Sequence, residues 1–309
     1  MPTDEVVAGY SALAKLHSRQ LELTPQYAKG LRKRFVGCDA RHLRAADHLA
    51  ACIERLAGDE LDVVLQDYDW ICQLMIREEI HFRRSGRYRL STFAEALAEV
   101  YSNDAFMHHY MNGLLVSQVW WSNHTETFRF YRENFLAAFA RPFRHLEIGP
   151  GHGLLLLEAG ASPLCESLEC WDVSPASIEQ TRAALDRLGA TKPVDFKVQD
   201  LFQAGDLTQR FDSIVMSEVL EHLERPDEAL RIVRGLLAPG GRLFVNMPVN
   251  SPAPDHIYLL TEPEAVAALV EAGGFKCVQT HFAPQTGMSL ERALRMQSTV
   301  SVAIVAEPH

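Results

Sequence analysis

The sequence predicts an α/β protein in which an all-α N-terminal region precedes a doubly wound, mostly parallel sheet. Up to about residue 140, apolar positions recur at three- and four-residue intervals, the spacing of amphipathic helices. From residue 143, short apolar runs alternate with helical patterns, which is the rhythm of βαβ units. We therefore expect a helical cap domain over residues 1–140 and an α/β domain over residues 141–309.

The N-terminal region is predicted to consist almost entirely of helices. Its clearest apolar patterns cover residues 43–58, 61–76, 91–101, 104–121 and 125–140. Ser91 stands where an N-cap is expected. The helices should break at Gly58, at Gly86 and in the polar segment 122–124.

The second region contains five apolar runs that predict parallel strands. They cover residues 144–149, 167–172, 194–199, 211–217 and 241–247. Two further strands, 275–282 and 300–307, have no good helix between them, which predicts an antiparallel pair at the sheet edge. Before them, Thr261 and Glu264 occupy capping-box positions of a helix that stops at a glycine pair.

The composition argues against several classes of protein, among them nucleic-acid binders and membrane-spanning proteins. The formal charge is −10 over 309 residues, which argues against a nucleic-acid binder, because such proteins usually show a basic face. The six cysteines form no CxxC pair and no metal-ligand spacing, so we expect reduced, buried thiols and no metal site. Neither a secretory signal nor an apolar run of ~20 residues is visible, which predicts a cytoplasmic protein without a membrane span.

A glycine-rich loop follows the first predicted strand, in the stretch HLEIGPGHGLLLLEAG (145–160). Its spacing is G-x-G-x-G, with Glu147 two positions before Gly149. This departs from the dinucleotide fingerprint G-x-G-x-x-G, and the lysine and Ser/Thr of a phosphate-binding P-loop are missing. The loop fits a ligand without phosphates, packed flat against the backbone, with Glu147 facing a positive charge.

Acidic residues end the next two strands. Asp172 can accept hydrogen bonds from both hydroxyls of a ribose, as the strand-end acid of dinucleotide folds does. Asp200 can accept from an exocyclic adenine amine while Leu201 covers the ring. Strand-end acids also cap helices, so a purely structural role for Asp200 stays open.

Five motifs in order resemble the class I S-adenosylmethionine-dependent methyltransferases: EIGPGHG, WDVSP, VQDLF, FDSIVMSEVLEHL and LLAPGGRLFV. The resemblance covers about residues 143–309. It implies a Rossmann-like, seven-stranded sheet whose last strand is antiparallel, and S-adenosylmethionine as the cofactor.

Residue by residue, the resemblance implies three groups of cofactor contacts. Glu147, Gly149, Gly151 and Gly153 would surround the methionine part. Asp172 would bind the ribose, with Val173 as a further cofactor contact. Asp200 and Leu201 would bind adenine, and Ser217 would line the floor of the site.

Three residues are candidates for catalysis: Tyr110, His222 and His256. A histidine has the near-neutral pKa that proton removal needs, although His222 can equally pack beneath the site. His256 lies with Asp255 and Tyr258 in a Pro-interrupted loop after the fifth strand, where such sheets keep their substrate crevice. Aromatic and amide residues of the helical region suggest a lid that shields the cofactor: Tyr110, Gln118, Trp120, Trp121, Asn123 and His124.

The predicted reaction is methyl transfer to a small-molecule acceptor, in secondary-metabolite biosynthesis. The chain lacks the Asn-Pro-Pro-Tyr tetrad of DNA and RNA amino methyltransferases. A large helical cap on this core is also similar to the azetidine-2-carboxylate synthases, which cyclise S-adenosylmethionine itself and release methylthioadenosine. A non-catalytic S-adenosylmethionine-binding module and an NAD-dependent oxidoreductase remain alternatives, the latter disfavoured by the glycine spacing. We expect no nucleic-acid or membrane partner, and the oligomeric state stays open.

Overall fold

A computed structural model describes residues 3–205 and 207–309. They form two compact units. The helical unit comprises residues 3–129, 251–257 and 283–298, and the sheet unit comprises residues 130–205, 207–250, 258–282 and 299–309. This division differs from the predicted boundary at residue 140, because residues 130–139 pack on the sheet and two segments that follow strands belong to the helical unit.

The sheet unit contains one seven-stranded sheet in the order β3-β2-β1-β4-β5-β7-β6. The strands β1 to β5 pair in parallel, and β7 runs antiparallel to β5, which confirms the predicted fold class. The strand order reverses at β1 and β4, where doubly wound sheets open a ligand crevice. The strands are β1 Phe143–Ile148, β2 Cys165–Asp172, β3 Val194–Val198, β4 Phe211–Ser217, β5 Leu237–Val249, β6 Phe275–Pro284 and β7 Val300–Pro308.

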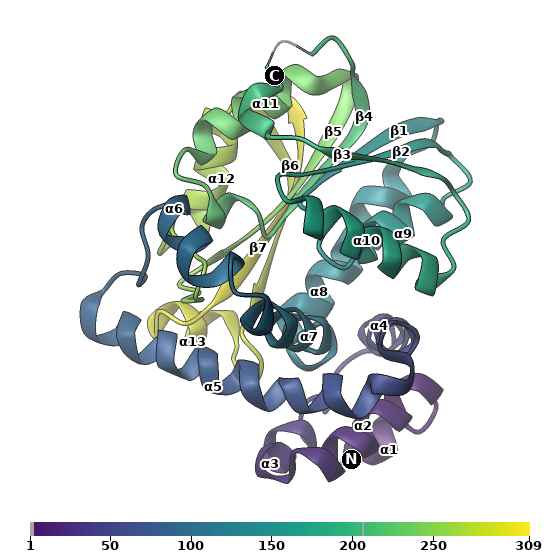
Figure 1. Cartoon of the computed structure of the whole chain (residues 1–309), viewed down its shortest axis with the longest axis vertical. Coiled ribbons are helices and arrows are strands. Elements are labelled where there is room, and N and C mark those ends of the chain that lie inside the picture. The colour runs from purple at the N-terminus through teal and green to yellow at the C-terminus, as the bar shows by residue number, and fades with distance from the viewer. Residues whose placement is uncertain (1–2, 206) are drawn as a thin grey trace. The chain divides into compact units, whose positions relative to one another are not determined.

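Helices cover both faces of this sheet. Alternation along β1 directs Phe143, His145 and Glu147 to one face. That face packs against α9 (Leu154–Ala161) and α10 (Pro175–Leu188) in one apolar cluster, and against residues 130–139 in another. Figure 1 shows α9 and α10 on one side of the sheet, with α11 (Pro226–Leu236) and α12 (Pro263–Ala272) on the other.

The helical unit is built mainly from α2, α4, α5 and α7, which pack against one another. Its segment 283–298 is held by hydrogen bonds from Arg83 to the carbonyl oxygen of Met296 and from the Ser122 amide to Thr286 Oγ1, each 2.6–2.7 Å long. The helices are α1 Thr3–Val7, α2 Ser11–Leu23, α3 Ala28–Leu31, α4 Ala40–Ala57, α5 Leu61–Ser85, α6 Phe93–Ala96, α7 Asp104–Trp120, α8 Ser122–Phe130 and α13 Leu290–Arg295. The last residue of α8 already belongs to the sheet unit.

Short 3₁₀ and π segments complete both units. The π segments Leu97–Tyr101 and Tyr131–Phe135 continue α6 and α8. The 3₁₀ segments are Pro25–Tyr27, Gly58–Glu60, Leu136–Ala138, Leu201–Gln203 and Leu220–His222.

Four details of the predicted helices were wrong. The N-cap is Thr92 rather than Ser91, because Thr92 and Glu95 form a reciprocal capping box. The chain breaks at Trp121, whose backbone is extended, and α8 begins directly at Ser122 inside the predicted break. Thr261 and Glu264 make no capping box: Glu262 is the N-cap of α12, and Pro263 pre-sets the first helical φ angle. A six-residue helix, α13, lies between β6 and β7.

Two expectations about the whole chain can be compared with the structure. All six cysteines are free thiols, but only Cys52, Cys165 and Cys170 are buried as expected, whereas the other three are partly exposed. Within residues 3–205 and 207–309, every helix is too short or too polar to traverse a bilayer.

The contact between α5 and α7 provides a test of the helical unit. A Cβ atom added to Gly113 would lie 2.6 Å from Ile71 Cβ and 3.1 Å from the Asp67 carbonyl oxygen. Because neither atom can rotate away, we expect Gly113→Ala to lower the free energy of unfolding by about 2 kcal/mol. Urea denaturation followed by circular dichroism measures this change.

Gly30→Ala is the control, since a Cβ there meets nothing within 4 Å and alanine is the better helix former. A Gly113→Ala protein as stable as the wild type would contradict the close packing of α5 and α7.

Candidate cofactor site

The loop between β1 and α9 turns through three left-handed glycines. The φ angles of Gly149, Gly151 and Gly153 are 66°, 52° and 70°, a region that residues with a Cβ atom rarely adopt. A Cβ on Gly149 would lie 2.9 Å from Val219 Cγ2, whereas a Cβ on Gly151 would meet no protein atom within 4 Å. The loop therefore presents bare backbone beside the start of α9.

Glu147, the penultimate residue of β1, is a buried acid two positions before the glycine loop. Its residue is 3% exposed, and its Oε2 atom has no hydrogen-bond partner among the described residues. Burial raises the pKa of Glu147 to about 8. The nearest imidazole atom, His145 Nε2, lies 3.9 Å from Oε2, and burial lowers the pKa of His145 to about 3. That neutral histidine cannot serve as a counter-ion, so the site favours a cation brought by a ligand.

The two strand-end acids, Asp172 and Asp200, each accept a hydrogen bond from a backbone amide two residues later. Asp172 Oδ1 accepts a hydrogen bond from the Ser174 amide at 2.8 Å, and burial raises the pKa of this carboxyl group. Asp200 accepts from the Phe202 amide at 2.9 Å and thereby caps the segment Leu201–Gln203, which is the structural role left open above. Each of these bonds fixes the orientation of a carboxylate that has further lone pairs.

Apolar surface lies beside both acids. Val173 is 53% exposed and Val198, the last residue of β3, is 57% exposed, whereas Leu201 is buried. Exposed valines at the carboxyl ends of two adjacent strands offer a surface on which a ring can pack.

The sequence interpretation missed two residues beside the end of β4: Glu218, which directly follows β4, and Asn246, which lies on β5. Glu218 has a φ angle of 56°, a strained backbone for a non-glycine residue, and its amide donates to the Asn246 carbonyl oxygen at 2.8 Å. The Asn246 side chain donates to Glu218 Oε1 and, at 3.5 Å, to Ser217 Oγ. Asn246 Oδ1 is buried without a described partner. No residue-type pattern reveals this pair, which depends on the pairing of β4 with β5.

The three candidate catalytic residues divide between the units. His222 lies in the 3₁₀ segment after β4, in the sheet unit with all nine predicted cofactor residues. Tyr110 and His256 belong to the helical unit, where the Tyr110 hydroxyl donates to Asp255 at 2.8 Å. His256 Nδ1 lies 2.7 Å from the Ser251 carbonyl oxygen. A carbonyl only accepts, so Nδ1 carries the proton and Nε2 carries the lone pair when the ring is neutral.

Three of the six predicted lid residues are buried: Tyr110, Trp120 and Asn123. Trp120 is 1% exposed, and its indole donates to Gln20 Oε1 at 3.0 Å. His124 Nδ1 contacts Ser117 Oγ at 3.0 Å, and burial lowers the pKa of His124 to about 4. The Trp120 ring therefore packs inside the helical unit and does not form a ligand wall.

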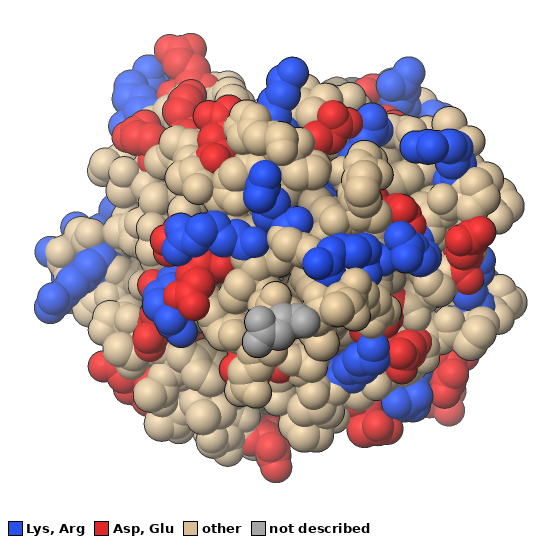
Figure 2. All heavy atoms as spheres, turned by 90° about the horizontal axis from the view of Figure 1, so that it is seen from above, with Lys and Arg blue, Asp and Glu red and all other residues tan. Residues whose placement is uncertain are grey.

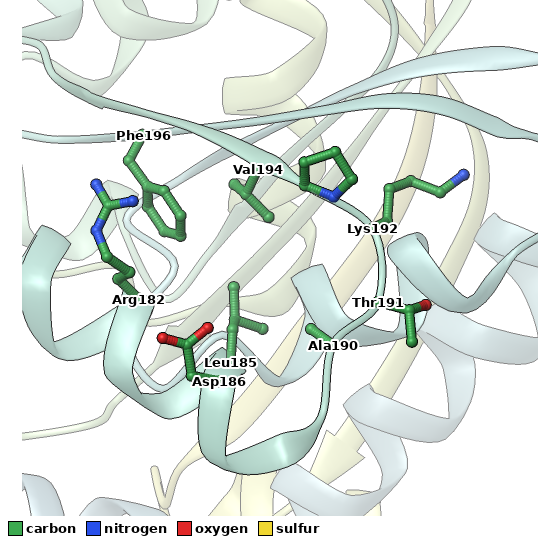
Figure 3. A pocket seen from close by; sticks show the side chains of 9 residues that line it. Arg182, Leu185, Asp186, Ala190, Thr191, Lys192, Val194 and Phe196 are labelled. Atoms are coloured by element: carbon green, nitrogen blue, oxygen red, sulfur yellow. The ribbon is translucent and has the colours of Figure 1, made fainter.

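A hollow of about 400 Å³ lies elsewhere in the sheet unit, between the end of α10 and the start of β3 (Figure 3). The Arg182 guanidinium stacks over the Phe196 ring at 4.1 Å, and Lys192 extends away to donate to the Cys165 carbonyl oxygen. This hollow contains none of the predicted site residues and lies at the amino end of β3. Parallel sheets bind their ligands at the carboxyl ends of the strands, so we place the cofactor there.

Comparison with known proteins finds a family match inside the sheet unit. Residues 146–243 match the family described as "Methyltransferase domain". This segment thus matches a methyltransferase domain, within a sheet that has the topology predicted for the class I S-adenosylmethionine-dependent methyltransferases.

Curated relatives of the methyltransferase domain share part of its sequence. The chain is 32% identical over 111 residues to the ubiquinone biosynthesis O-methyltransferases of Xanthomonas oryzae pv. oryzae and Xanthomonas axonopodis pv. citri. The match covers 36% of this chain and spans 45% of the length of those relatives.

Two solved structures are similar to the chain. The N-methyltransferase NodS from Bradyrhizobium japonicum, in complex with S-adenosyl-l-homocysteine, gives a TM-score of 0.49 at 21% identity and covers 71% of this chain and 100% of that one. The [4+2]-cyclase SpnF gives a TM-score of 0.44 at 17% identity and covers 54% of this chain and 74% of that one.

The residues of the methyltransferase domain fit its cofactor. S-adenosylmethionine carries a sulfonium and an ammonium but no phosphate. A glycine loop without a phosphate-binding lysine and a buried acid whose Oε2 has no described partner, Glu147, suit such a ligand.

Gly151→Ala tests whether the cofactor packs against the glycine loop. Gly151 and Gly189, the C-cap of α10, both have positive φ angles and open space around the added Cβ. Both alanine variants should lose about 1–2 kcal/mol of stability through backbone strain. Only Gly151→Ala should also raise the Kd for S-adenosylmethionine, by at least about tenfold. Equal Kd values for the two variants, measured by calorimetry, would place the ligand away from the loop.

The raised pKa of Glu147 predicts that the affinity for S-adenosylmethionine depends on pH. At pH 7 its carboxyl group is largely protonated, since burial raises the pKa to about 8. A cationic ligand favours the carboxylate, so binding releases a proton and the affinity should increase from pH 6.5 to 8. The neighbours that face Glu147 titrate outside this window: the pKa of His145 is lowered to about 3, that of Cys170 is raised to about 12 and that of Tyr131 is raised well above its usual value.

Calorimetry in buffers of different ionisation enthalpy counts the released protons. Glu147→Gln should remove the part of the pH dependence that does not come from the ligand's own amine. A pH profile unchanged by Glu147→Gln would show that this acid does not ionise on binding.

Proposed function

We propose that the chain is an S-adenosylmethionine-dependent methyltransferase that acts on a small acceptor. The observation that carries the proposal is the arrangement at the carboxyl edge of β1 to β4. Three left-handed glycines follow the buried Glu147, whose Oε2 has no described partner. Asp172 ends β2, the neighbour of β1, and Asp200 follows β3, the next strand of the sheet. The proposed contacts are those of Glu147 and the glycines with the methionine part, of Asp172 with the ribose, and of Asp200 and Leu201 with adenine.

The protein has a limited chemical task in such a reaction. The bound cofactor supplies a methyl group already activated by the sulfonium leaving group. The chain must bind that cofactor, align an acceptor in line with the methyl group and exclude water. The bare backbone of Gly149–Gly153 and the charge of Glu147 serve binding, while the strained Glu218, held by Asn246, gives the end of β4 a fixed shape.

A small acceptor is supported by charge and by the relatives. The formal charge is −10, and on the face drawn in Figure 2 basic and acidic side chains are interspersed, so that face carries no continuous basic surface for a phosphate backbone. The curated relatives carry the name of O-methyltransferases of ubiquinone biosynthesis, which is small-molecule chemistry. We place the reaction in the biosynthesis of a secondary metabolite.

The second candidate is an azetidine-2-carboxylate synthase, in which the α-amine of S-adenosylmethionine attacks its own γ-carbon. The amine loses a proton, the γ-carbon–sulfur bond breaks, and methylthioadenosine leaves. The feature that favours this reaction is the large helical unit that accompanies the sheet unit.

One incubation separates the two reactions. Purified protein is mixed with S-adenosylmethionine alone, and the products are analysed by mass spectrometry against a no-enzyme control. We expect intact S-adenosylmethionine until an acceptor is added, after which S-adenosylhomocysteine accumulates. Methylthioadenosine together with azetidine-2-carboxylate would instead establish the cyclase. Thermal stabilisation by NAD and not by S-adenosylmethionine would contradict both reactions.

The ribose contact is tested by Asp172→Ala. Loss of hydrogen bonds to a charged acceptor should raise the Kd for S-adenosylmethionine about 10- to 100-fold. Asp186→Ala is the matched control, an exposed acid on α10 in the same unit. If Asp172→Ala binds as tightly as the control, the ribose is held elsewhere.

A further inference from the structure

His145 lies beside Glu147 on one face of β1. A single residue separates them, so both side chains leave the strand on the same side, and both are buried. His145 Nε2 lies 3.9 Å from Glu147 Oε2, which is beyond the length of a hydrogen bond. Neither atom has a hydrogen-bond partner among the described residues. Two buried polar atoms of neighbouring side chains are therefore close together and unbonded.

Ser213 contacts the other nitrogen of the His145 ring. It stands directly opposite His145 in the parallel pairing of β1 with β4, and its Oγ atom lies 2.8 Å from His145 Nδ1. Ser213 is fully buried, and His145 is the one described partner of its side chain. The hydroxyl proton of Ser213 therefore has Nδ1 as its described acceptor.

The direction of this bond selects the tautomer of His145. If Nδ1 donated to Ser213, the hydroxyl proton of Ser213 would be buried without a described acceptor, which is unfavourable. If Ser213 donates to Nδ1, both atoms of the contact are satisfied. The ring is neutral at pH 7, because burial lowers the pKa of His145 to about 3. Its single proton then lies on Nε2, the nitrogen near Glu147.

Two other titratable side chains face Glu147, and both are uncharged at neutral pH. Cys170 stands opposite Glu147 on β2, and burial raises the pKa of its thiol to about 12. Burial also raises the pKa of Tyr131 well above its usual value, and the Tyr131 hydroxyl donates to the Leu155 carbonyl oxygen at 3.2 Å. The Nε2 proton of His145 is thus a donor that faces Glu147 without adding a charge.

We propose that His145 and Ser213 are positioning residues for Glu147, and that they present an uncharged N–H to the carboxylate that forms when the cofactor binds. This inference rests on the proposed function, because a cationic cofactor is what ionises Glu147. The proton of Glu147 leaves to the solvent, and His145 keeps its own proton on Nε2. The distance between Nε2 and Oε2 then shortens to that of a hydrogen bond.

An uncharged donor suits this task better than a cation. A lysine or arginine beside Glu147 would neutralise the carboxylate before the ligand arrives and would repel a sulfonium or an ammonium. A neutral N–H stabilises the carboxylate and leaves its negative charge to the ligand. A lone pair on Nε2, the result of the other tautomer, would instead oppose ionisation of Glu147.

The tautomer of His145 can be measured directly in the wild-type protein. In protein labelled with ¹⁵N at histidine, the chemical shift separates a ring nitrogen that carries a proton from one that carries a lone pair. The signals of His145 are those absent from the spectrum of His145→Gln. We expect the proton on Nε2 both with and without S-adenosylmethionine at pH 7. A proton on Nδ1 overturns the proposal.

Variants of the two positioning residues should change the pH dependence of cofactor binding. Without the N–H, the carboxylate of Glu147 is less favourable, so the rise in affinity with pH should begin later. In His145→Leu we expect its midpoint to move up by about one pH unit and the Kd for S-adenosylmethionine at pH 7 to increase about tenfold. Ser213→Ala should change both in the same direction by a smaller amount, about threefold in Kd, because it only releases the other tautomer.

Two further variants separate positioning from packing. His145→Gln keeps an N–H donor at the end of its side chain and should retain the wild-type midpoint. Ser301→Ala is the matched control, a buried serine on β7, which β4 and β5 separate from β1 in the sheet. The proposal is overturned if His145→Leu and Ser213→Ala keep the wild-type midpoint, if His145→Gln behaves like His145→Leu, or if Ser301→Ala shifts the midpoint as much as Ser213→Ala.

Methylthioadenosine keeps this test separate from the proposed function. It contains the nucleoside but lacks both the sulfonium and the amino acid, so its Kd should not depend on whether Glu147 ionises. We expect this Kd to be the same in the wild type and in all four variants. Wild-type protein that binds S-adenosylmethionine with the same pH profile as His145→Leu would leave the function standing and overturn the inference. Wild-type protein that binds neither S-adenosylmethionine nor methylthioadenosine would overturn the function itself.

Discussion

The parallel pairing of β1 on both of its edges is the constraint on which the cofactor site depends. With β2 on one side and β4 on the other, β1 lies inside the sheet, and every residue of β1 except Arg144 is buried. Glu147 is 3% exposed, and burial raises its pKa to about 8. The same pairing ends at Ile148, so the chain must turn at once toward α9. Glycine supplies the left-handed angles of that turn. The buried acid and the bare loop are thus two consequences of one pairing.

Much of the sheet unit could be predicted from local signals. Apolar runs of strand length marked all seven strands, and glycine spacing together with strand-end acids indicated the ligand class. Helix starts were harder, because Ser91 and Thr92 are both good caps and only backbone geometry selects Thr92. Thr261 and Glu264 had the right spacing, but Pro263 fixes the start of α12 one residue later. Spacing therefore identifies a helix more reliably than it identifies the cap.

The polar pairs between distant segments had no sequence signal. Asn246 meets Glu218 only because β4 and β5 pair in register. Tyr110 and Asp255 are separated by 145 positions, and no periodicity connects a helix residue to a loop residue at that distance. Glu218 and Asn250 also hold left-handed backbones, with φ angles of 56° and 48°, directly after β4 and β5. Such strain costs of order 1–3 kcal/mol per residue and concentrates where a fixed shape serves function.

The bond between Tyr110 and Asp255 also limits the chemistry of the helical unit. To act as a base, Tyr110 would have to be a phenolate, which would place a negative charge 2.8 Å from a carboxylate. Both residues are at most 4% exposed, so water screens that repulsion poorly. The neutral phenol is therefore the favoured state, and it can orient a substrate but not remove its proton. His256 differs, because its Nδ1 donates to Ser251 and its Nε2 keeps a lone pair at neutral charge. The bond to Asp255 therefore argues against a base at the phenol of Tyr110, while the bond to Ser251 fixes only the tautomer of His256.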